Sequence, residues 1–153
     1  MQFRRSIAGR GLIVCAVLAG FAWQGPLSAG AAGAFPFEQE LVLDAAPMPP
    51  VKRMPVLTIS ENGRATVDLW CRTVVARVQI DGEAIKIETA PLPEALPQYM
   101  SAGQCSEARV AADNEMLSAL AQVTEWRKRG DDVELTAAEG ASLAPLRFRA
   151  SSH

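Results

Sequence analysis

Histidine is nearly missing from this chain, in which His153 is the only one among 153 residues. A Ser-His-Asp triad or a Cys-His pair would depend on that single imidazole as its general base. The Cys-x-x-Cys spacing of redox proteins is also absent, and Asp44, Asp68 and Glu83 lack the spacing of a calcium-binding loop. We therefore expect no catalytic residues, no metal site and no cofactor, and we expect that the protein is not an enzyme.

Two adjacent acidic residues, Asp131 and Asp132, favour the opposite interpretation, that the protein is an enzyme. Two acids side by side could perform acid-base chemistry, and the alternative function is an envelope hydrolase that uses such surface carboxylates. Their position after Gly130, between two strand-like segments, instead favours a hairpin turn. A structural role in the turn is therefore the preferred interpretation.

Long apolar runs are also missing, apart from residues 12–23 near the amino terminus. Three arginines precede this run and small residues follow it, which is the pattern of a secretory signal peptide. The run is shorter than the roughly 17–25 residues that span a bilayer, and Cys15 lacks the preceding small residue that lipidation favours. We expect a cleavable signal over residues 1–34, cut after Ala31 or Ala34, and Sec export to the periplasm or beyond in a bacterium.

Basic residues are too few for a nucleic-acid-binding protein. The whole chain carries 15 Lys and Arg against 17 Asp and Glu, and removal of the three signal-peptide arginines leaves a formal charge of −5. Binding to nucleic acid depends largely on neutralising phosphates with Lys and Arg. The remaining length of about 120 residues suits one domain, which we expect at 55–150 after an N-terminal strand and Pro-rich linker at 35–54. We expect no transmembrane segment after signal cleavage.

Two cysteines, Cys71 and Cys105, remain after the signal segment. In an oxidising compartment, one disulfide between them is the simplest prediction. Two free buried thiols are the alternative. Zinc is disfavoured because a structural site needs four Cys or His ligands, whereas this part of the chain offers two cysteines and His153.

Alternating apolar and polar residues predict a mainly β protein. The pattern predicts strands at 41–44, 56–59, 65–70, 73–80, 84–88, 124–128, 133–136 and 146–149. Asn62-Gly63 and Asp81-Gly82 are typical hairpin turns between such strands. The expected fold is α+β: a compact antiparallel sheet or partly closed barrel of about six to eight short strands with one packed helix.

That helix is predicted at about 106–124, where apolar residues recur with helical spacing after Ser106. Its opposite face, expected to be polar, carries Arg109, Asp113, Glu115 and Gln122. The helix is therefore expected to pack on the sheet through one apolar side.

Three aromatic residues are candidates for binding a ligand or partner: Trp70, Tyr99 and Trp126. Tyr99 lies in a Pro-rich connection, and Trp126 precedes the basic run 127–129. Long connections and rim aromatics often form binding surfaces, although prolines that stiffen a loop and a tryptophan in the core are the plainer explanations. Binding is expected at the barrel mouth, at this connection or at the two tryptophans.

The sequence resembles the META domain, the family of HslJ-like heat-shock and secreted proteins. The resemblance is carried by Cys105, by the segments 115–126 and 130–135, and by Leu146-Arg147-Phe148. It covers roughly Pro55 to Phe148, but Trp70-Cys71-Arg72 stands where the family has Gly-Cys-Asn, which indicates a divergent member. The resemblance implies a compact β domain with one helix, exported in bacteria, linked to stress resistance and envelope roles and without an established enzymatic activity. Its partner would be an unknown envelope protein or small ligand.

Overall fold

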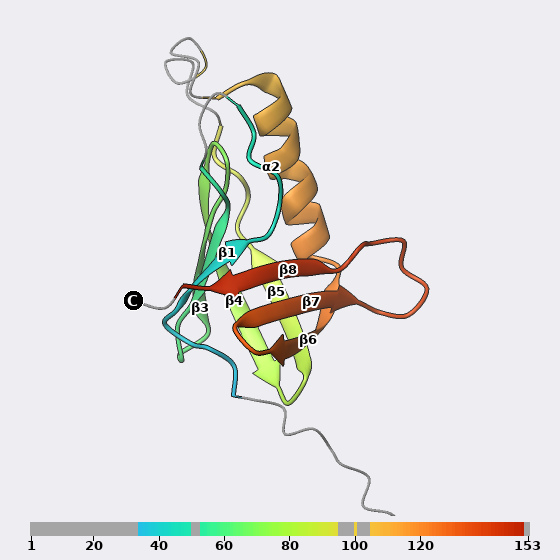
Figure 1. Cartoon of the computed structure of the whole chain (residues 1–153). Coiled ribbons are helices and arrows are strands. Elements are labelled where there is room, and N and C mark those ends of the chain that lie inside the picture. Colours follow the sequence, from blue (N-terminus) through green and yellow to red (C-terminus); the bar gives the residue numbers. More distant parts are fainter. Residues whose placement is uncertain (1–33, 50–52, 95–99, 101–104, 152–153) are drawn as a thin grey trace, which may run out of the picture.

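Eight antiparallel strands form a closed barrel with one helix beside it (Figure 1). The computed structural model describes residues 34–49, 53–94, 100 and 105–151. The elements are β1 (Glu40–Leu43), β2 (Val56–Ile59), β3 (Arg64–Asp68), β4 (Thr73–Asp81), β5 (Ala84–Thr89), α2 (Glu107–Leu120), β6 (Val123–Arg129), β7 (Asp132–Ala137) and β8 (Leu146–Ala150). The predicted mainly β fold with a single helix is thus confirmed for the described residues. The signal peptide predicted up to residue 34 falls almost entirely outside them.

The first strand closes the barrel. β1 pairs with β2, where Leu41 lies opposite Leu57, and on its other side with β8, where Leu43 lies opposite Phe148. Both pairings are antiparallel, so each of the eight strands has two neighbours. β1, which we assigned to a segment preceding the domain, is therefore an integral part of the barrel.

The core follows from side-chain alternation along each strand. In β4, Val74, Ala76 and Val78 are buried, whereas Val75 and Arg77 between them point outward. Most other strands place one alternating set of apolar residues in the same core, whereas β6 contributes Val123 and Trp126 on either side of a register shift. The remaining positions, which are mostly polar, therefore form the outer face of the barrel.

The helix completes this core at the connection between β5 and β6. These two strands share one register pair, Ala84 with Glu125, and a bond from the Trp126 N–H to the Glu83 carbonyl oxygen at 2.9 Å. α2 lies in the intervening connection (Figure 1) and adds Met116, Leu117 and Leu120 to the core. The helix thus supplies apolar surface beside the pairing of β5 with β6, which is the shortest in the barrel. Within the described residues, no helix combines the length and apolarity needed to cross a membrane.

Two predictions about the helix were wrong. It ends at Leu120 rather than near 124, because Val123 already belongs to β6. Arg109 and Asp113, expected on the solvent face, are 1% and 0% exposed. Both occupy the stripe that also holds Met116 and Leu120, because residues three, four and seven positions apart share one helix face.

The β2–β3 hairpin turns at Asn62-Gly63, as the sequence predicted. Gly63 has φ +78°, and a Cβ built on it would lie 2.6 Å from the Val78 carbonyl oxygen. Its own carbonyl oxygen accepts a bond of 2.8 Å from the Val78 N–H. Glycine is needed here both for the backbone conformation and for the close approach of β4.

Candidate functional site

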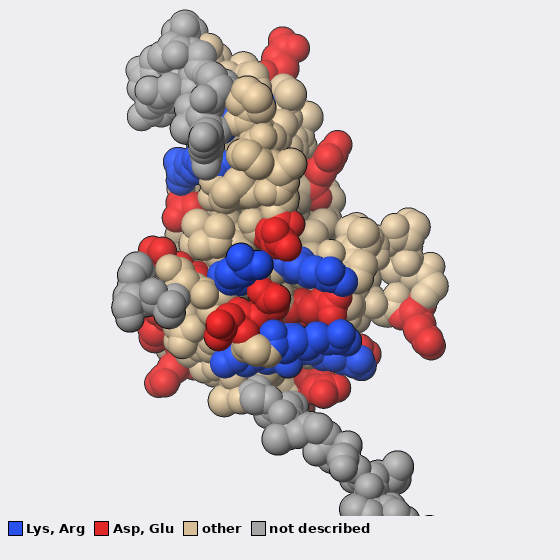
Figure 2. Space-filling model, in the orientation of Figure 1, with Lys and Arg blue, Asp and Glu red and all other residues tan. Residues whose placement is uncertain are grey.

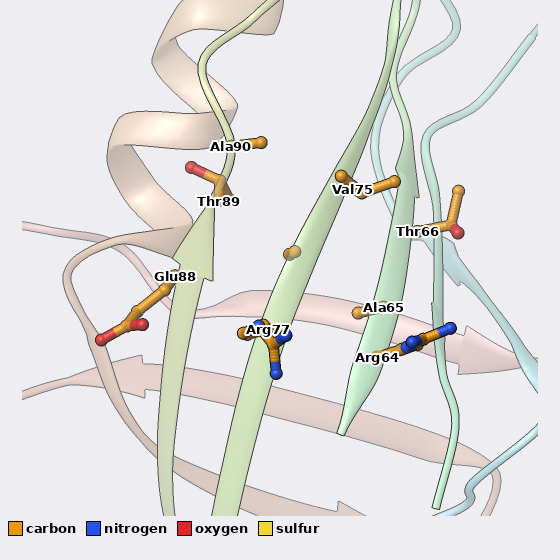
Figure 3. A pocket seen from close by; sticks show the side chains of 9 residues that line it. Arg64, Ala65, Thr66, Val75, Arg77, Glu88, Thr89 and Ala90 are labelled. Atoms are coloured by element: carbon orange, nitrogen blue, oxygen red, sulfur yellow. The ribbon is translucent and has the colours of Figure 1, made fainter. Parts of the chain in front are cut away.

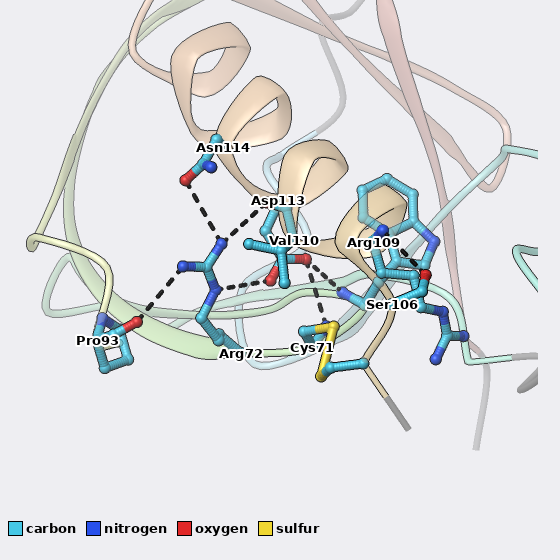
Figure 4. Close-up of polar contacts among 10 residues, drawn as sticks. Cys71, Arg72, Pro93, Ser106, Arg109, Val110, Asp113 and Asn114 are labelled. Carbon is cyan, nitrogen blue, oxygen red and sulfur yellow. Dashed lines mark hydrogen bonds and ion pairs between the residues drawn. A yellow bond between two sulfur atoms is a disulfide. The ribbon is translucent and has the colours of Figure 1, made fainter. Parts of the chain in front are cut away.

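Asp113 of α2 holds the turn between β3 and β4. Its Oδ1 accepts hydrogen bonds from the backbone N–H groups of Trp70 at 3.0 Å and Cys71 at 3.3 Å. Its Oδ2 accepts from Arg72 Nε at 2.9 Å, and the two side chains are 0% and 11% exposed (Figure 4). These four residues form what we call the Asp113 cluster. The carboxylate has a donor on each oxygen, as a buried charge requires.

Arg72 adds further contacts with the helix and connects the Asp113 cluster to one more segment. Its Nη2 donates to the Val110 carbonyl oxygen at 3.0 Å and to Asn114 Oδ1 at 3.4 Å. Its Nη1 donates to the Pro93 carbonyl oxygen at 3.5 Å, in the connection that leads away from β5. One guanidinium therefore joins the β3–β4 turn, the helix and the Pro-rich connection (Figure 4).

The structure joins Cys71 and Cys105 in a disulfide, with 5.4 Å between their Cα atoms. Cys71 belongs to the Asp113 cluster, and Cys105 immediately precedes Ser106, the N-cap residue of α2. The covalent bond thus fastens this turn to the start of the helix, and the ion pair fastens the same turn to the middle of the helix at Asp113. Cys105 is buried, so this pair has the surroundings of a structural bridge.

The three candidate binding aromatics are not brought together. Trp70 is partly buried against the core, and its Nε1 has no hydrogen-bond partner among the described residues. Trp126 is 4% exposed, donates from Nε1 to the Gly82 carbonyl oxygen at 2.8 Å and packs edge-on against Phe35 with centroids 4.9 Å apart. The ring of Trp126 is therefore part of the core and is not offered to a ligand on the outer surface. Tyr99 lies outside the described residues.

Alternating bands of basic and acidic side chains cross the outer face of β6, β7 and β8 (Figure 2). The ion pairs there are Arg127–Glu125 at 3.8 Å, Arg129–Glu134 at 3.8 Å, Arg147–Glu134 at 3.4 Å and Arg149–Asp132 at 3.5 Å. Most of these side chains are more than half exposed, so each pair adds little stability. The charges on this face largely neutralise one another, and one of the two candidate catalytic carboxylates, Asp132, forms an ion pair with Arg149.

Within the part of the chain that the structure describes, no three His, Cys, Asp or Glu side chains are grouped to hold a metal ion.

A hollow of about 540 Å³ lies on the barrel wall formed by β3, β4 and β5 (Figure 3). We call it the β3–β5 groove. It is lined by Arg64, Ala65, Thr66, Val75, Ala76, Arg77, Glu88, Thr89 and Ala90. Ala65 and Ala76 point inward and lie opposite each other in the β3–β4 register. The outward-pointing side chains on either side of this pair form the surface of the groove that a ligand could contact.

Positive charge on the rim of the groove is incompletely neutralised. Arg64 lies opposite Arg77 in the β3–β4 register, and neither has an ion pair with an acid among the described residues. Glu88 lies opposite Arg77 on the other side, but its carboxylate contacts Lys86 Nζ at 2.6 Å. The hydrogen bond from Lys86 and the charge of Lys86 lower the pKa of Glu88, desolvation opposes them, and the charge of Arg77 lowers the pKa by a smaller amount.

Beside these arginines lies an apolar patch. Val75 is 64% exposed and is the one large hydrophobic residue of the described chain with such exposure. It lies opposite Thr66, and its carbonyl oxygen accepts a bond of 2.9 Å from the Ala90 N–H. The groove therefore combines two guanidinium groups that form no ion pair among the described residues with an exposed aliphatic side chain.

Comparison with known proteins identifies the family. The family model of the META domain matches residues 37–150, from just before β1 to the end of β8. The chain belongs to the META-domain family. The resemblance to this family is thus confirmed, and the match begins at residue 37 rather than at Pro55. No curated protein sequence and no solved structure matches the chain.

Sequence reasoning missed two features of this META domain, one structural and one a candidate site. The Asp113 cluster was hidden because a charged residue on a helix is normally assigned to solvent, although the spacing of Arg109, Asp113, Met116 and Leu120 already places them on one stripe. The β3–β5 groove was missed because it appears only when strand registers are known. Its one visible indication was Val75, an apolar residue at an outward position of an alternating strand.

Proposed function

We propose that this META-domain protein is exported to the bacterial envelope and acts there as a non-enzymatic binding module. The observation that carries the proposal is the β3–β5 groove, where Arg64 and Arg77 lie side by side, form no ion pair among the described residues and have only Glu88 nearby, next to the exposed Val75. Exposed aliphatic surface and unpaired like charges are unfavourable in an isolated domain. Their coincidence in a hollow is typical of a surface that another molecule covers.

Export is supported by two independent features. The amino-terminal segment has the charge, apolar run and small residues of a cleavable signal. The bond between Cys71 and Cys105 belongs to the class of structural disulfides, which persist in oxidising compartments. The core of the barrel is packed with side chains, so a partner would bind to the outer wall. A role in stress resistance would then depend on that bound partner.

Site-specific crosslinking tests the binding function. A photoreactive p-benzoylphenylalanine replaces Val75 in the full chain, expressed in its bacterial host or a close relative. Gln79 is the matched control position, because it is an exposed outward residue of the same strand that does not line the groove. We expect discrete envelope adducts from position 75, fewer adducts from position 79, and loss of the former when Arg64 and Arg77 are both changed to Gln. Equal adducts at both positions, or none at 75, would contradict the proposal.

Export and the absence of catalysis have separate tests. The mass of the protein recovered from the periplasm should correspond to cleavage after Ala31 or Ala34, with no added lipid; an unprocessed cytoplasmic chain would refute export. The purified protein should turn over no peptidoglycan, ester or glycoside substrate. Turnover that disappears in Asp131→Asn or Asp132→Asn would establish the hydrolase alternative instead.

A further inference from the structure

We propose that the β3–β5 groove binds an acidic peptide segment of a partner protein, in extended conformation, with an acidic and an apolar residue two positions apart. This inference rests on the proposed binding function and specifies the chemistry of the ligand. It assigns a different task to each half of the groove. Arg64 and Arg77 would hold the carboxylate, and Val75 would contact the apolar side chain.

The carboxylate half follows from the strand register. Arg64 and Arg77 are direct cross-strand partners on the outer face, and two like charges in that arrangement repel each other. A carboxylate placed on them relieves the repulsion and gains charge-assisted hydrogen bonds, which the planar guanidinium forms in pairs. Glu88 fills this role only in part: it lies opposite Arg77, but its carboxylate contacts Lys86 Nζ at 2.6 Å and forms no ion pair with either arginine.

The apolar half follows from the spacing along β4. Val75 precedes Arg77 by two residues on the same face, which corresponds to about 6.6 Å along the strand at roughly 3.3 Å per residue. An extended peptide has the same repeat, so its side chains two positions apart reach both sites when it runs along β4. Thr66 on β3 and Ala90 just after β5 lie on either side of Val75 and also line the groove (Figure 3). Their small side chains add to the surface that the apolar residue of the peptide can contact.

The charge distribution favours a peptide over a membrane or a nucleic acid. Binding to an anionic bilayer usually needs a cluster of about four to eight basic residues, whereas the basic residues that line this groove are the two arginines Arg64 and Arg77. The chain without its signal carries a formal charge of −5, which opposes approach to a polyanion as a whole. A locally positive groove on an acidic domain is instead suited to a short segment with one or two carboxylates.

Fluorescence anisotropy with a labelled peptide tests this proposal on the disulfide-bonded, signal-free chain. The probe is fluorescein-Gly-Ser-Glu-Ser-Leu-Ser-Glu-Ser-Leu-Ser-Gly, titrated at about 50 mM salt, where screening is weak. We expect saturable binding that weakens about tenfold or more in the double variant Arg64→Gln/Arg77→Gln, equivalent to about 1.4 kcal/mol. Val75→Ser should weaken binding about threefold. Arg147→Gln, on the self-neutralised face, should bind as the original chain does.

Two control peptides separate charge from spacing. Replacing both Glu residues by Gln should abolish binding, and moving each Leu next to its Glu should weaken binding because the two side chains then point to opposite sides of the strand. Equal affinity for the original peptide and either control would overturn the proposal. Equal affinity of the double arginine variant, with an unchanged thermal unfolding curve, would overturn it as well. If that variant does not fold, Val75→Ser together with the spacing control decides the result.

Other anions distinguish the failure of this inference from failure of the proposed function. Phosphatidylglycerol vesicles, a single-stranded oligonucleotide and inorganic phosphate are tested in parallel. Binding of one of these through Arg64 and Arg77, without peptide binding, would overturn the peptide assignment and leave the groove as a binding site. No binding of any probe, together with no adduct from position 75, would overturn both.

Discussion

Replacing Asp113 by Ala should be among the most destabilising single changes in this barrel. The substitution removes a fully buried carboxylate that accepts from the Trp70 and Cys71 N–H groups and from Arg72 Nε. Breaking a buried ion pair by removing one partner costs about 3–5 kcal/mol, because the other charge stays buried without compensation. Two backbone donors also lose their acceptor. Against a total stability of about 5–15 kcal/mol for a domain, we expect a loss of about 3–5 kcal/mol.

Urea unfolding, followed by tryptophan fluorescence and by circular dichroism, measures this loss. The midpoint should fall while the slope stays unchanged, because the folded barrel and the unfolded chain expose similar surface in both proteins. In thermal unfolding, the same loss corresponds to roughly 12–20 °C at roughly 4 °C per kcal/mol. Asp132→Ala is the matched control, since that aspartate forms an exposed ion pair with Arg149 at 3.5 Å. It should cost less than about 1 kcal/mol.

A double-mutant cycle tests whether the loss arises from the ion pair itself. Arg72→Met and Asp113→Leu are combined, because a buried pair can often be replaced by apolar residues at small cost. The double variant should lose at least about 1 kcal/mol less than the sum of the single variants. The reasoning is refuted if Asp113→Ala costs less than about 1 kcal/mol, or if the two single effects simply add.

Three further changes test other parts of the fold. Gly63→Ala should destabilise the domain by at least about 1 kcal/mol more than Gly82→Ala in urea unfolding, because both glycines have positive φ but a Cβ meets backbone only at position 63; equal losses would contradict this. Changing Cys71 and Cys105 together to Ser should cost about 3–4 kcal/mol for a loop of this length, and alkylation with mass spectrometry of the unreduced parent should detect no free thiol. Trp126→Phe should cost about 1–3 kcal/mol by removing a buried hydrogen-bond donor, whereas a thermal midpoint equal to that of the parent would show that the ring packing alone is sufficient.

The sequence predicted the hairpins because their information is local. Asn62-Gly63 and Asp81-Gly82 specify the turns, and the alternation on either side specifies which residues enter the core. It did not predict full closure, because the pairing of Leu43 with Phe148 joins strands at opposite ends of the domain. No short-range pattern carries that contact.

The candidate site was less accessible from the sequence than the fold. The pairing of Cys71 with Cys105 was predictable, since two cysteines expected to lie in an oxidising compartment have one simple partner each. The burial of Asp113 depends on a turn more than forty positions away that supplies its donors. The β3–β5 groove depends on three strands meeting in one register, so Arg64 and Arg77 become neighbours only in the folded barrel.

Pairing of the first strand with the last one also dictates the order of folding. β1 cannot acquire its second neighbour until Leu146–Ala150 has been synthesised and has crossed any membrane that the chain traverses. Up to that point β1 and β7 expose unpaired edges, which can recruit other chains. Contacts of such long sequence separation also form slowly. The barrel is therefore most vulnerable to aggregation just before its carboxy-terminal strand arrives, and truncation within that strand should harm recovery of the protein more than its short length suggests.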